Sequence, residues 1–474
     1  MHENIDTLII GAGSAGLAAL REVRKRTDSF LIVNDGPWGT TCARVGCMPS
    51  KLLIEAANAF HRRNSFEAFG IRGAGQLHVD LPAVLHRVRS LRDGFVAGTI
   101  QDSDAGDRQI SGRAHLLGPD RVSVNGKEYR ARRIIIATGT RPRFENAWRS
   151  LGDRVLTTDS LFEQPTLGRR MAVLGLGAVG TEMAQALARL GIEVTAFVTR
   201  RSAAGLSDPE VLGALWPLLE REFAIHVGER ARLAAHAHGV EVISGDHRVV
   251  VDQVLVASGR VPNVEGLGLD TLGVTLDEHG LPPFDRNSRQ VADLPVFIAG
   301  DLDPARALLH EAVDEGHIAG MNAFAGQPQG FRRRTALAIT FSQPNAAVVG
   351  RSFKELSGED IVIGHIDFSR QGRARIAQEN AGLLRVYADR ATGRLLGSEM
   401  CAPAGEHLAH LLALAVNNGL TVQQMLNMPI YHPVLEEGLR TALRRAASQW
   451  SAKGGDKAVS DLEACDLNRC GVMD

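Results

Sequence analysis

"DTLIIGAGSAGLAALREVRKR", residues 6–26, is the stretch that decides the expected fold of this 474-residue chain. An apolar run suited to a buried strand leads into a turn that contains Gly11, Gly13 and Gly16, and an Ala/Leu-rich helical segment follows. A second apolar run, FLIVND, comes next. Glycines at these positions let the backbone approach a pyrophosphate, which then lies at the positive end of the helix. The stretch therefore predicts a strand, turn and helix that bind a dinucleotide.

The same pattern returns at residues 169–198, "RRMAVLGLGAVGTEMAQALARLGIEVTAFV", with turn glycines Gly175, Gly177 and Gly180. One glycine turn is weak evidence, because such turns are common. Here each copy follows a strand, opens a helix and precedes a further strand, which is the context that dinucleotide binding requires. We therefore expect an α/β chain with two Rossmann-like domains and two dinucleotides, rather than two ordinary α/β turns.

Two cysteines lie five positions apart in "GTTCARVGCMPSKLL", residues 39–53. In a regular helix the Cα atoms of Cys42 and Cys47 would lie about 8 to 9 Å apart, whereas a disulfide needs about 4.4 to 6.8 Å. If the two bond, the segment must be irregular, and Gly46 with Pro49 supplies the means. Cys47 then falls near a helix start, where the dipole lowers the pKa of a thiol. We predict a labile pair suited to thiol exchange. No metal site is predicted, because no close Cys/His pair joins these two.

Thiol chemistry needs a base, and "PIYHPVLEEGL", residues 429–439, offers one. His432 precedes a proline that we expect to start a helix. Glu437, five positions on, could hold the tautomer of the imidazole. Taken alone, a His-Pro pair before a helix is more often structural, so the weight of this motif comes from the others.

The overall composition excludes several classes of protein. The chain has 53 Lys+Arg against 54 Asp+Glu, a net charge of -1, which gives no reason to expect nucleic acid or an anionic membrane as a partner. No apolar run reaches the roughly 18 residues of a membrane span, and the N-terminus lacks the basic region of a signal peptide. We expect a cytoplasmic protein, in which paired cysteines are redox-active, catalytic or metal-binding rather than structural. The basic run at residues 332–334 is expected to be solvated surface.

In order, these motifs resemble those of the pyridine nucleotide-disulfide oxidoreductases, a family of flavoproteins. The similarity covers about residues 5–450: the first fingerprint, CxxxxC with Pro-Ser-Lys, ATG, the second fingerprint, GRxPN, GD, and His-Pro with Glu five positions on. The CMPSK segment is most similar to that of dihydrolipoamide dehydrogenases. The family's usual GGTC is GTTC here, and Tyr431 and Val434 depart from the common form of the histidine segment.

The resemblance implies a set of site residues. Cys47 would face the flavin of FAD, and Cys42 would exchange with substrate. Lys51 would pair with Glu182 beside the flavin. His432 and Glu437 would act in the site of the neighbouring subunit, which makes a homodimer obligatory. The remaining residues implied for FAD are Gly11, Gly13, Gly16, Thr138, Gly139, Asp301 and, at the ribose, either Asn34 or Asp35; those implied for the nicotinamide dinucleotide are Gly175, Gly177, Gly180, Glu182 and Gly259.

The end of the second fingerprint bears on which nicotinamide dinucleotide is used. An NAD site places an acid there to bind the ribose hydroxyl, but the position holds Val198. Arg200 and Arg201 follow at once and suit a 2'-phosphate. The sequence favours NADPH over NADH. The alternative is a solvated loop, and Gly180 is the choice more usual with NAD in this family.

The domain organisation follows from the motifs. After about residue 335 the pattern changes to strands broken by turns and then to helices, which predicts a separate α+β domain. The last residues lose all periodicity and predict a flexible tail. The expected domains are an FAD-binding domain with the redox disulfide at 1–150, an NAD(P)-binding domain at 151–270, a return segment that completes the FAD domain at 271–334, a dimerisation domain at 335–450, and a tail at 451–474.

Several functions stay open at this point. The leading expectation is an enzyme that passes electrons between a nicotinamide and a small disulfide, a dithiol or a lipoyl-bearing protein. The tail cysteines Cys465 and Cys470 repeat the spacing of the first pair, which raises a thioredoxin-reductase-like relay as an alternative. A soluble transhydrogenase would not need the thiols. A flavin-binding structural or sensor subunit would keep its role without them.

Overall fold

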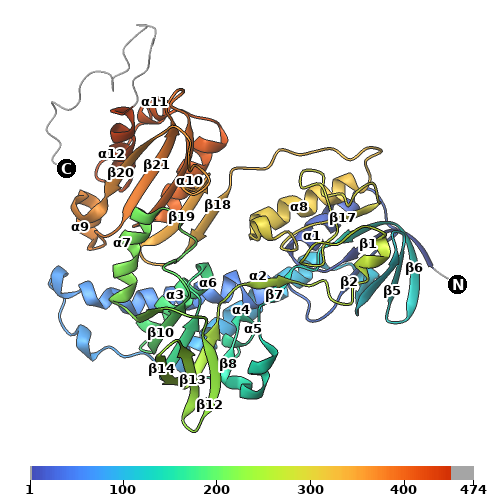
Figure 1. Ribbon diagram of the computed structural model, residues 1–474, viewed down its shortest axis with the longest axis horizontal. Helices are drawn as coiled ribbons and strands as arrows, with labels where there is room; N and C mark the ends of the chain where they lie inside the picture. Colours follow the sequence, from blue (N-terminus) through green and yellow to red (C-terminus); the bar gives the residue numbers. More distant parts are fainter. Residues whose placement is uncertain (1–2, 450–474) are drawn as a thin grey trace, which may run out of the picture.

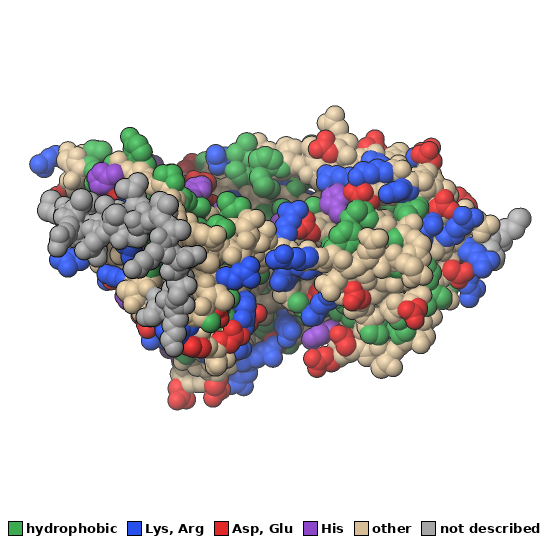
Figure 2. Space-filling view, turned by 90° about the horizontal axis from the view of Figure 1, so that it is seen from above, with side chains coloured by type: hydrophobic (Ala, Val, Ile, Leu, Met, Phe, Trp, Pro, Cys, Tyr) green, Lys and Arg blue, Asp and Glu red, His purple; other side chains and the backbone are tan. Residues whose placement is uncertain are grey.

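Figure 1 shows the computed structural model, which describes residues 3–449, as three units that are each built around a sheet. The N-terminal unit carries β1 and α1, the second unit carries β9 and α6, and the C-terminal unit carries β18 to β22. Cys465 and Cys470, the predicted relay of the tail, lie outside the described residues. Figure 2 shows side chains of both signs spread over one face, with Lys and Arg gathered around the hollow in its middle.

The first sheet has the order β3-β2-β1-β6-β5-β4, and β17 pairs with β6. β1, β2, β6 and β17 are parallel, and the apolar run of β1 is buried between them, with Leu8 and Ile9 fully covered. The strands are β1 (Glu3–Ile10), β2 (Phe30–Asn34), β3 (Gln109–Ser111), β4 (Ala114–Gly118), β5 (Arg121–Val124), β6 (Lys127–Ile136) and β17 (Val296–Ile298).

The glycine turn leads from β1 into α1 (Ser14–Val23), as predicted. A Cβ on Gly16 would lie 1.9 Å from the carbonyl oxygen of Gly11. In the second copy, a Cβ on Gly180 would lie equally close, at 1.9 Å, to the carbonyl oxygen of Gly175. No larger residue fits where helix and turn approach so closely. The return segment adds α8 (Leu309–Asn322), which packs along α1 with Gly316 against Ala15. β17 and α8 therefore complete the first unit from a distant part of the sequence.

The second sheet is parallel, with the order β11-β10-β9-β15-β8, and all of its strands fall within the predicted segment 151–270. A three-stranded antiparallel sheet, β12-β13-β14, packs beside it. The elements are β8 (Val155–Leu156), α5 (Thr158–Leu161), β9 (Arg170–Leu174), α6 (Ala178–Arg189), β10 (Glu193–Val198), α7 (Pro209–Glu220), β11 (Ala224–Val227), β12 (Arg232–His236), β13 (Gly239–Ser244), β14 (His247–Val251) and β15 (Gln253–Val256).

Three helices from the N-terminal part of the chain pack against this second unit: α2 (Thr41–Val45), α3 (Cys47–His61) and α4 (Leu81–Ser103). Leu53 on α3 and Leu85 on α4 are fully buried in one apolar core with Met183 of α6. The thiol-bearing helices therefore come from the N-terminal part of the chain but pack with the second unit.

A two-stranded ribbon joins the two units. The ATG and GRxPN motifs, far apart in sequence, pair as β7 (Thr140–Pro142) and β16 (Arg260–Pro262). Asn263 clamps the ribbon, because its backbone N–H donates to Gly139 O and its side chain donates to Thr138 O. The turns that end β6 and β15 are thereby held together.

The C-terminal unit begins at β18, near the predicted change of pattern at residue 335. Its antiparallel sheet has the order β18-β19-β22-β21-β20, with α10 and α12 packed on it. The elements are β18 (Leu337–Thr340), β19 (Asn345–Gly350), β20 (Ile361–Asp367), α9 (Gly372–Ala377), β21 (Leu383–Asp389), β22 (Leu395–Ala402), α10 (Gly405–Asn417), α11 (Val422–Leu426) and α12 (Glu436–Ala447). No helix within residues 3–449 is long and apolar enough to cross a membrane.

A buried polar cluster ties the second unit to the C-terminal unit. Asp208, the N-cap of α7, is fully buried, and its carboxylate accepts two bonds of 2.7 and 2.8 Å from Nη1 of Arg385 on β21. The hydroxyl of Tyr387 donates to the same carboxylate at 2.7 Å. Glu399 on β22 accepts from the backbone N–H groups of Ser207 and Asp208. The start of α7 is therefore anchored on the third sheet.

Candidate active site

The thiol pair lies where two helices meet at one glycine. α2 ends at Val45, Gly46 leaves the helical conformation with φ -117° and ψ -114°, and α3 begins at Cys47. The irregularity and the helix start predicted at these positions are confirmed. Cys42 and Cys47 are free thiols that hydrogen-bond to each other. Thr40, at the position that departs from the family's GGTC, caps α2 by accepting from Ala43 N at 3.1 Å.

The two thiols differ in acidity. The hydrogen bond that Cys42 donates and the positive charge of Lys51 together lower the pKa of Cys47 to about 7, against the opposing effect of burial. The same hydrogen bond, together with burial, raises the pKa of Cys42 well above the ordinary value. In the dithiol the negative charge therefore resides on Cys47, and Cys42 keeps its proton.

This difference predicts the pH dependence of alkylation. In a Cys42→Ser holoenzyme, which keeps a hydroxyl donor beside Cys47, reaction with iodoacetamide should be slow below pH 7 and rise through a midpoint of about 7. Only the thiolate reacts, so the midpoint reports the pKa of Cys47. The rate is measured by mass spectrometry across pH 5 to 10, and Lys51→Gln should move the midpoint upward. A midpoint near the ordinary thiol value of about 8.5 would contradict the assignment.

Lys51 and Glu182 form the predicted pair. Nζ of Lys51, on the second turn of α3, donates to both carboxylate oxygens of Glu182 at 3.0 and 2.9 Å. Glu182 lies on α6 and also accepts from the backbone N–H of Phe341 at 2.8 Å. Lys51 lies 4.6 Å from the centre of the Phe341 ring. One carboxylate thus joins α3, α6 and the segment after β18 next to the thiols, and no motif of the sequence pointed to Phe341.

His432 and Glu437 are in contact. Nδ1 of His432 lies 3.0 Å from Glu437 Oε1, and the other carboxylate oxygen accepts from Val434 N at 3.1 Å. The prediction that the helix starts at the proline is wrong, because α12 begins at Glu436. The His432 side chain is 71% exposed, and within residues 3–449 of one chain no hydrogen bond or ion pair joins it to either thiol. An exposed imidazole with a fixed carboxylate can serve a site on another subunit.

The first glycine turn fits a bound dinucleotide. The N-cap of α1 is Gly13, which has no side chain to cap the helix, so its first N–H groups are available to an anion. Oδ1 of Asn34 accepts from Ala12 N at 3.1 Å, and its Nδ2 donates to Gly36 O and Pro37 O. The amide oxygen of Asn34 therefore holds the backbone of the glycine turn, while its amide nitrogen holds the backbone that follows β2. Asp35, next to it, is exposed.

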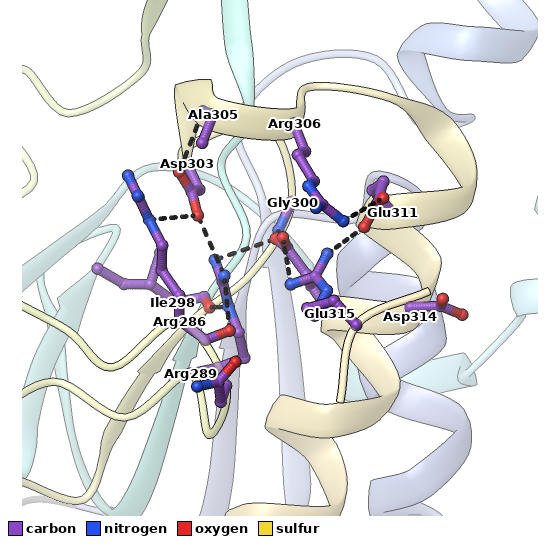
Figure 3. A network of polar contacts seen from close by, with 12 residues as sticks. Arg286, Arg289, Ile298, Gly300, Asp303, Ala305, Arg306, Glu311, Asp314 and Glu315 are labelled. Carbon is purple, nitrogen blue, oxygen red and sulfur yellow. Dashed lines mark hydrogen bonds and ion pairs between the residues drawn. The ribbon is translucent and has the colours of Figure 1, made fainter. Parts of the chain in front are cut away.

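Asp301 follows β17 on a rigidly held loop. Burial raises the pKa of its carboxyl, and no side-chain hydrogen bond or ion pair from residues 3–449 reaches it, which fits a site that a cofactor hydroxyl completes. Glu315 on α8 accepts from Gly300 N at 2.8 Å, just before Asp301 (Figure 3). Arg289 and Arg333 in turn lie 3.0 and 2.9 Å from the two carboxylate oxygens of Glu315.

The network in Figure 3 corrects one expectation. Residues 332–334 were expected to be solvated surface, and Arg332 and Arg334 are exposed, but the Arg333 side chain is 15% exposed and pairs with Glu311 as well as Glu315. Arg289 is fully buried and also pairs with Asp303 at 3.2 Å. These cations stabilise two buried acids of α8, an arrangement that basic composition alone does not signal.

The second glycine turn opens on a pocket of about 480 Å³. Its walls include the turn itself, the ends of β10 and β15, and the ribbon residue Arg260. The N-cap of α6 is Gly177, again without a side-chain cap. Of the residues predicted for the nicotinamide dinucleotide, Gly175, Gly177, Gly259 and Arg200 line this pocket, whereas Gly180, Glu182 and Arg201 do not. Val198, the position that lacks the acid of an NAD site, lines the pocket as well.

The structure places the two predicted arginines differently. Arg200 lines the pocket, whereas the guanidinium of Arg201 lies 5.3 Å from the centre of the Trp216 ring on α7. Two further charged residues of the pocket, Glu229 and Arg230, follow β11 and belong to no motif. Sequence reasoning missed them, because their position depends on the pairing of β11 with β10.

Comparison with known proteins identifies the class. The family model of pyridine nucleotide-disulphide oxidoreductases matches residues 5–316, and that of the family's dimerisation domain matches residues 337–443. The chain therefore belongs to the pyridine nucleotide-disulphide oxidoreductase family. It is a FAD-dependent, dihydrolipoyl dehydrogenase-like enzyme whose family binds FAD and NAD(P). The dimerisation domain supports a homodimer.

Individual relatives agree with this class. Dihydrolipoyl dehydrogenase from Thermus scotoductus is 32% identical over 450 residues, which cover 92% of this chain and 96% of that protein. The structure of LpdA from Mycobacterium tuberculosis is similar with a TM-score of 0.81 and 25% identity, covering 93% of this chain and 99% of that one. A HOCl-induced flavoprotein disulfide reductase from Escherichia coli, solved as a Cu(II) complex, shares the fold with a TM-score of 0.81 and 20% identity over 94% and 99% of the two chains.

Proposed function

We propose that this enzyme passes electrons between NADPH and a disulfide through Cys42 and Cys47. The observation that carries the proposal is the contact of the two thiols at the break between α2 and α3, with the negative charge on Cys47. A thiolate beside a protonated partner is poised for exchange, since one sulfur can hold charge while the other attacks. The overall reaction consumes NADPH, one proton and one disulfide and yields NADP and two thiols.

The chain's own residues divide the work. FAD, when bound, supplies the two-electron chemistry that links a hydride to a thiol pair. The uncapped start of α1, Asp301 and the Lys51–Glu182 pair are the groups that would hold it. Lys51 also stabilises the thiolate of Cys47. Thr138 and Gly139, which Asn263 fixes, would form the floor of the same site.

Cys42 would carry out exchange with the substrate. Because its pKa is raised, it needs a base before its sulfur can attack a disulfide. We assign that base to His432 of the partner subunit, held in its tautomer by Glu437 at 3.0 Å. The imidazole would take the proton of Cys42 and return it to the departing thiolate. A small disulfide or an oxidised lipoyl group suits this step, whereas a dithiol substrate would react in the reverse direction, with the disulfide of Cys42 and Cys47.

The preference for NADPH rests on the pocket at the second glycine turn. Val198 ends β10 without a carboxylate for the ribose hydroxyls, and Arg200 lines the pocket with no ion-pair partner among residues 3–449. A guanidinium free of other partners suits a phosphate monoester. Gly175, Gly177 and Gly180 would receive the pyrophosphate at the start of α6.

The test is an anaerobic reductive titration that counts the electrons accepted per FAD. We expect about four for the chain cut after residue 450, two for the flavin and two for the thiol pair. Replacing both Cys42 and Cys47 by serine should reduce the count to about two. If the number of electrons accepted per FAD is the same with and without these substitutions, the thiol relay is refuted and a soluble transhydrogenase is favoured.

The same titration on the full chain tests the thioredoxin-reductase-like alternative. Its motivation is the spacing of Cys465 and Cys470, which repeats that of the first pair. A count of about six, falling to four in a Cys465→Ser, Cys470→Ser variant, would make the tail a third redox centre. If the full chain and this variant both accept four electrons, the tail cysteines take no part in electron transfer, and a dihydrolipoamide dehydrogenase-type reaction is favoured.

A further inference from the structure

We propose that Arg230 completes, together with Arg200, the site for the 2'-phosphate of NADPH, and that Arg201 takes no part in it. The inference rests on the proposed use of NADPH and names the residues that distinguish it from NADH. Arg230 follows β11 and lies outside every motif of the sequence. Its role therefore depends on how the second sheet is assembled.

The register of β10 and β11 brings the two arginines to the same edge of the sheet. The strands are parallel with Val198 opposite Val227, and Gly228 N donates to Val198 O at 2.9 Å. The segments that follow the two strands therefore run side by side. Arg200 lies two positions after Val198 and Arg230 three after Val227, and both line the same pocket.

Arg230 is held by an acid, Glu145, that shortly precedes the pocket residue Trp148. Its Nη2 donates to Glu145 Oε1 at 2.5 Å, and the backbone of Glu145 accepts from the N–H of Trp148, a buried residue of the pocket wall. A guanidinium has five N–H donors, so one bond to Glu145 orients the group and leaves others for a ligand. The Arg230 side chain is 69% exposed, which leaves it open to one.

Arg201 is turned the other way. Its guanidinium lies 5.3 Å from the centre of the Trp216 ring, on the α7 side of the loop, and it is absent from the pocket walls. Ser202 and Thr199, by contrast, line the pocket and can add hydroxyl donors. Of the two adjacent arginines, Arg200 therefore faces the pocket, whereas Arg201 packs on Trp216.

One acid in the pocket opposes phosphate binding and must be weighed. Glu229 precedes Arg230 and could instead accept the two ribose hydroxyls of NADH. Its carboxyl leans toward the turn between β13 and β14, since a Cβ on Gly245 would lie 4.0 Å from Glu229 Cδ. The three arginines that line the pocket, Arg200, Arg230 and Arg260, outnumber Glu229 and the Glu145 that pairs with Arg230, and a phosphate monoester carries about 1.5 to 2 negative charges at neutral pH.

The experiment compares Arg230→Ala and Arg200→Ala with Arg201→Ala as the matched control, all as holoenzymes. Loss of a charge-assisted bond should lower kcat/KM for NADPH by about 10- to 100-fold in Arg230→Ala and in Arg200→Ala. The kcat/KM for NADH should be unchanged in both variants. Affinity for the redox-inert probe 2',5'-ADP should fall by the same factor, while that for 5'-AMP stays constant. Arg230→Lys should recover part of the loss, and Arg201→Ala should behave as wild type toward all four ligands.

The outcomes separate this inference from the proposed function. If the wild type itself prefers NADH, the NADPH assignment fails and the phosphate site fails with it. If the wild type prefers NADPH but Arg230→Ala does not change the preference, or Arg201→Ala abolishes it, the inference alone is overturned. Glu229→Gln adds a check: unchanged or improved use of NADPH together with unchanged use of NADH supports the inference, and a loss of NADH use without effect on NADPH overturns it.

Discussion

Replacing Cys47 by serine is expected to lower NADPH-dependent disulfide reduction by at least about a thousandfold, the order that removal of a covalent nucleophile costs in other enzymes. Cys47 holds the thiolate of the pair, with a pKa of about 7 set by Cys42 and Lys51. A serine hydroxyl in its place cannot ionise in this range or form a disulfide. The measurement is steady-state turnover with a small disulfide and with lipoamide.

Two controls separate lost chemistry from lost structure. Reduction of ferricyanide by NADPH bypasses the thiols and should persist in Cys47→Ser, with FAD content unchanged. Cys401→Ser serves as the matched variant, because Cys401 is fully buried in the third unit and should leave disulfide turnover within about twofold of wild type. Turnover by Cys47→Ser above a tenth of the wild-type value would exclude the relay and point to direct hydride exchange or a non-catalytic flavin subunit.

Replacing Arg385 by methionine is expected to destabilise the protein by about 3 to 5 kcal/mol, the effect of leaving one member of a buried ion pair without its partner. Asp208 is fully buried, and its carboxylate accepts two hydrogen bonds, of 2.7 and 2.8 Å, from the positively charged guanidinium of Arg385. Burial, together with Asp208, raises the pKa of Tyr387, so that hydroxyl remains a donor but supplies no charge. The midpoint of thermal unfolding of the holoenzyme, at fixed protein concentration, should fall by several degrees.

The surface pair of Arg351 and Glu359 provides the matched control for this prediction. Both side chains are 44% exposed, so Arg351→Met should cost at most about 1 kcal/mol. Asp208→Asn, combined with Arg385→Met, should recover more than half of the loss, because the amide carries no charge and can still cap α7. Equal effects of Arg385→Met and Arg351→Met would show that the buried cluster does not hold the two units together.

Local patterns predicted much of the architecture and the thiol site. Both glycine turns precede helices, the helical conformation is interrupted at Gly46, and Lys51 pairs with Glu182, as predicted. These three features were predictable because each depends on a motif with a fixed backbone requirement. The contact between His432 and Glu437 was predictable for the same reason, since five positions bridge the turn before a helix.

Features that depend on distant pairing were not predictable. The ribbon of β7 with β16 and the position of Arg230 follow from strand register, which no single segment encodes. The adjacent Arg200 and Arg201 carry identical chemistry in the sequence, and the ring of Trp216 on α7 distinguishes them in the fold. Arg333 was assigned to the surface because the two acids of α8 with which it forms ion pairs lie about twenty positions away in the sequence.

The break at Gly46 also governs how the protein behaves between encounters with substrate. Because the chain turns there, each thiol meets the other at an effective concentration far above that of any thiol in solution. A mixed disulfide formed at Cys42 is therefore resolved from within, before a second molecule arrives. A side chain at position 46, whose Cβ would lie 3.0 Å from Thr41 O, would push the two helices apart and leave the enzyme prone to trapped adducts.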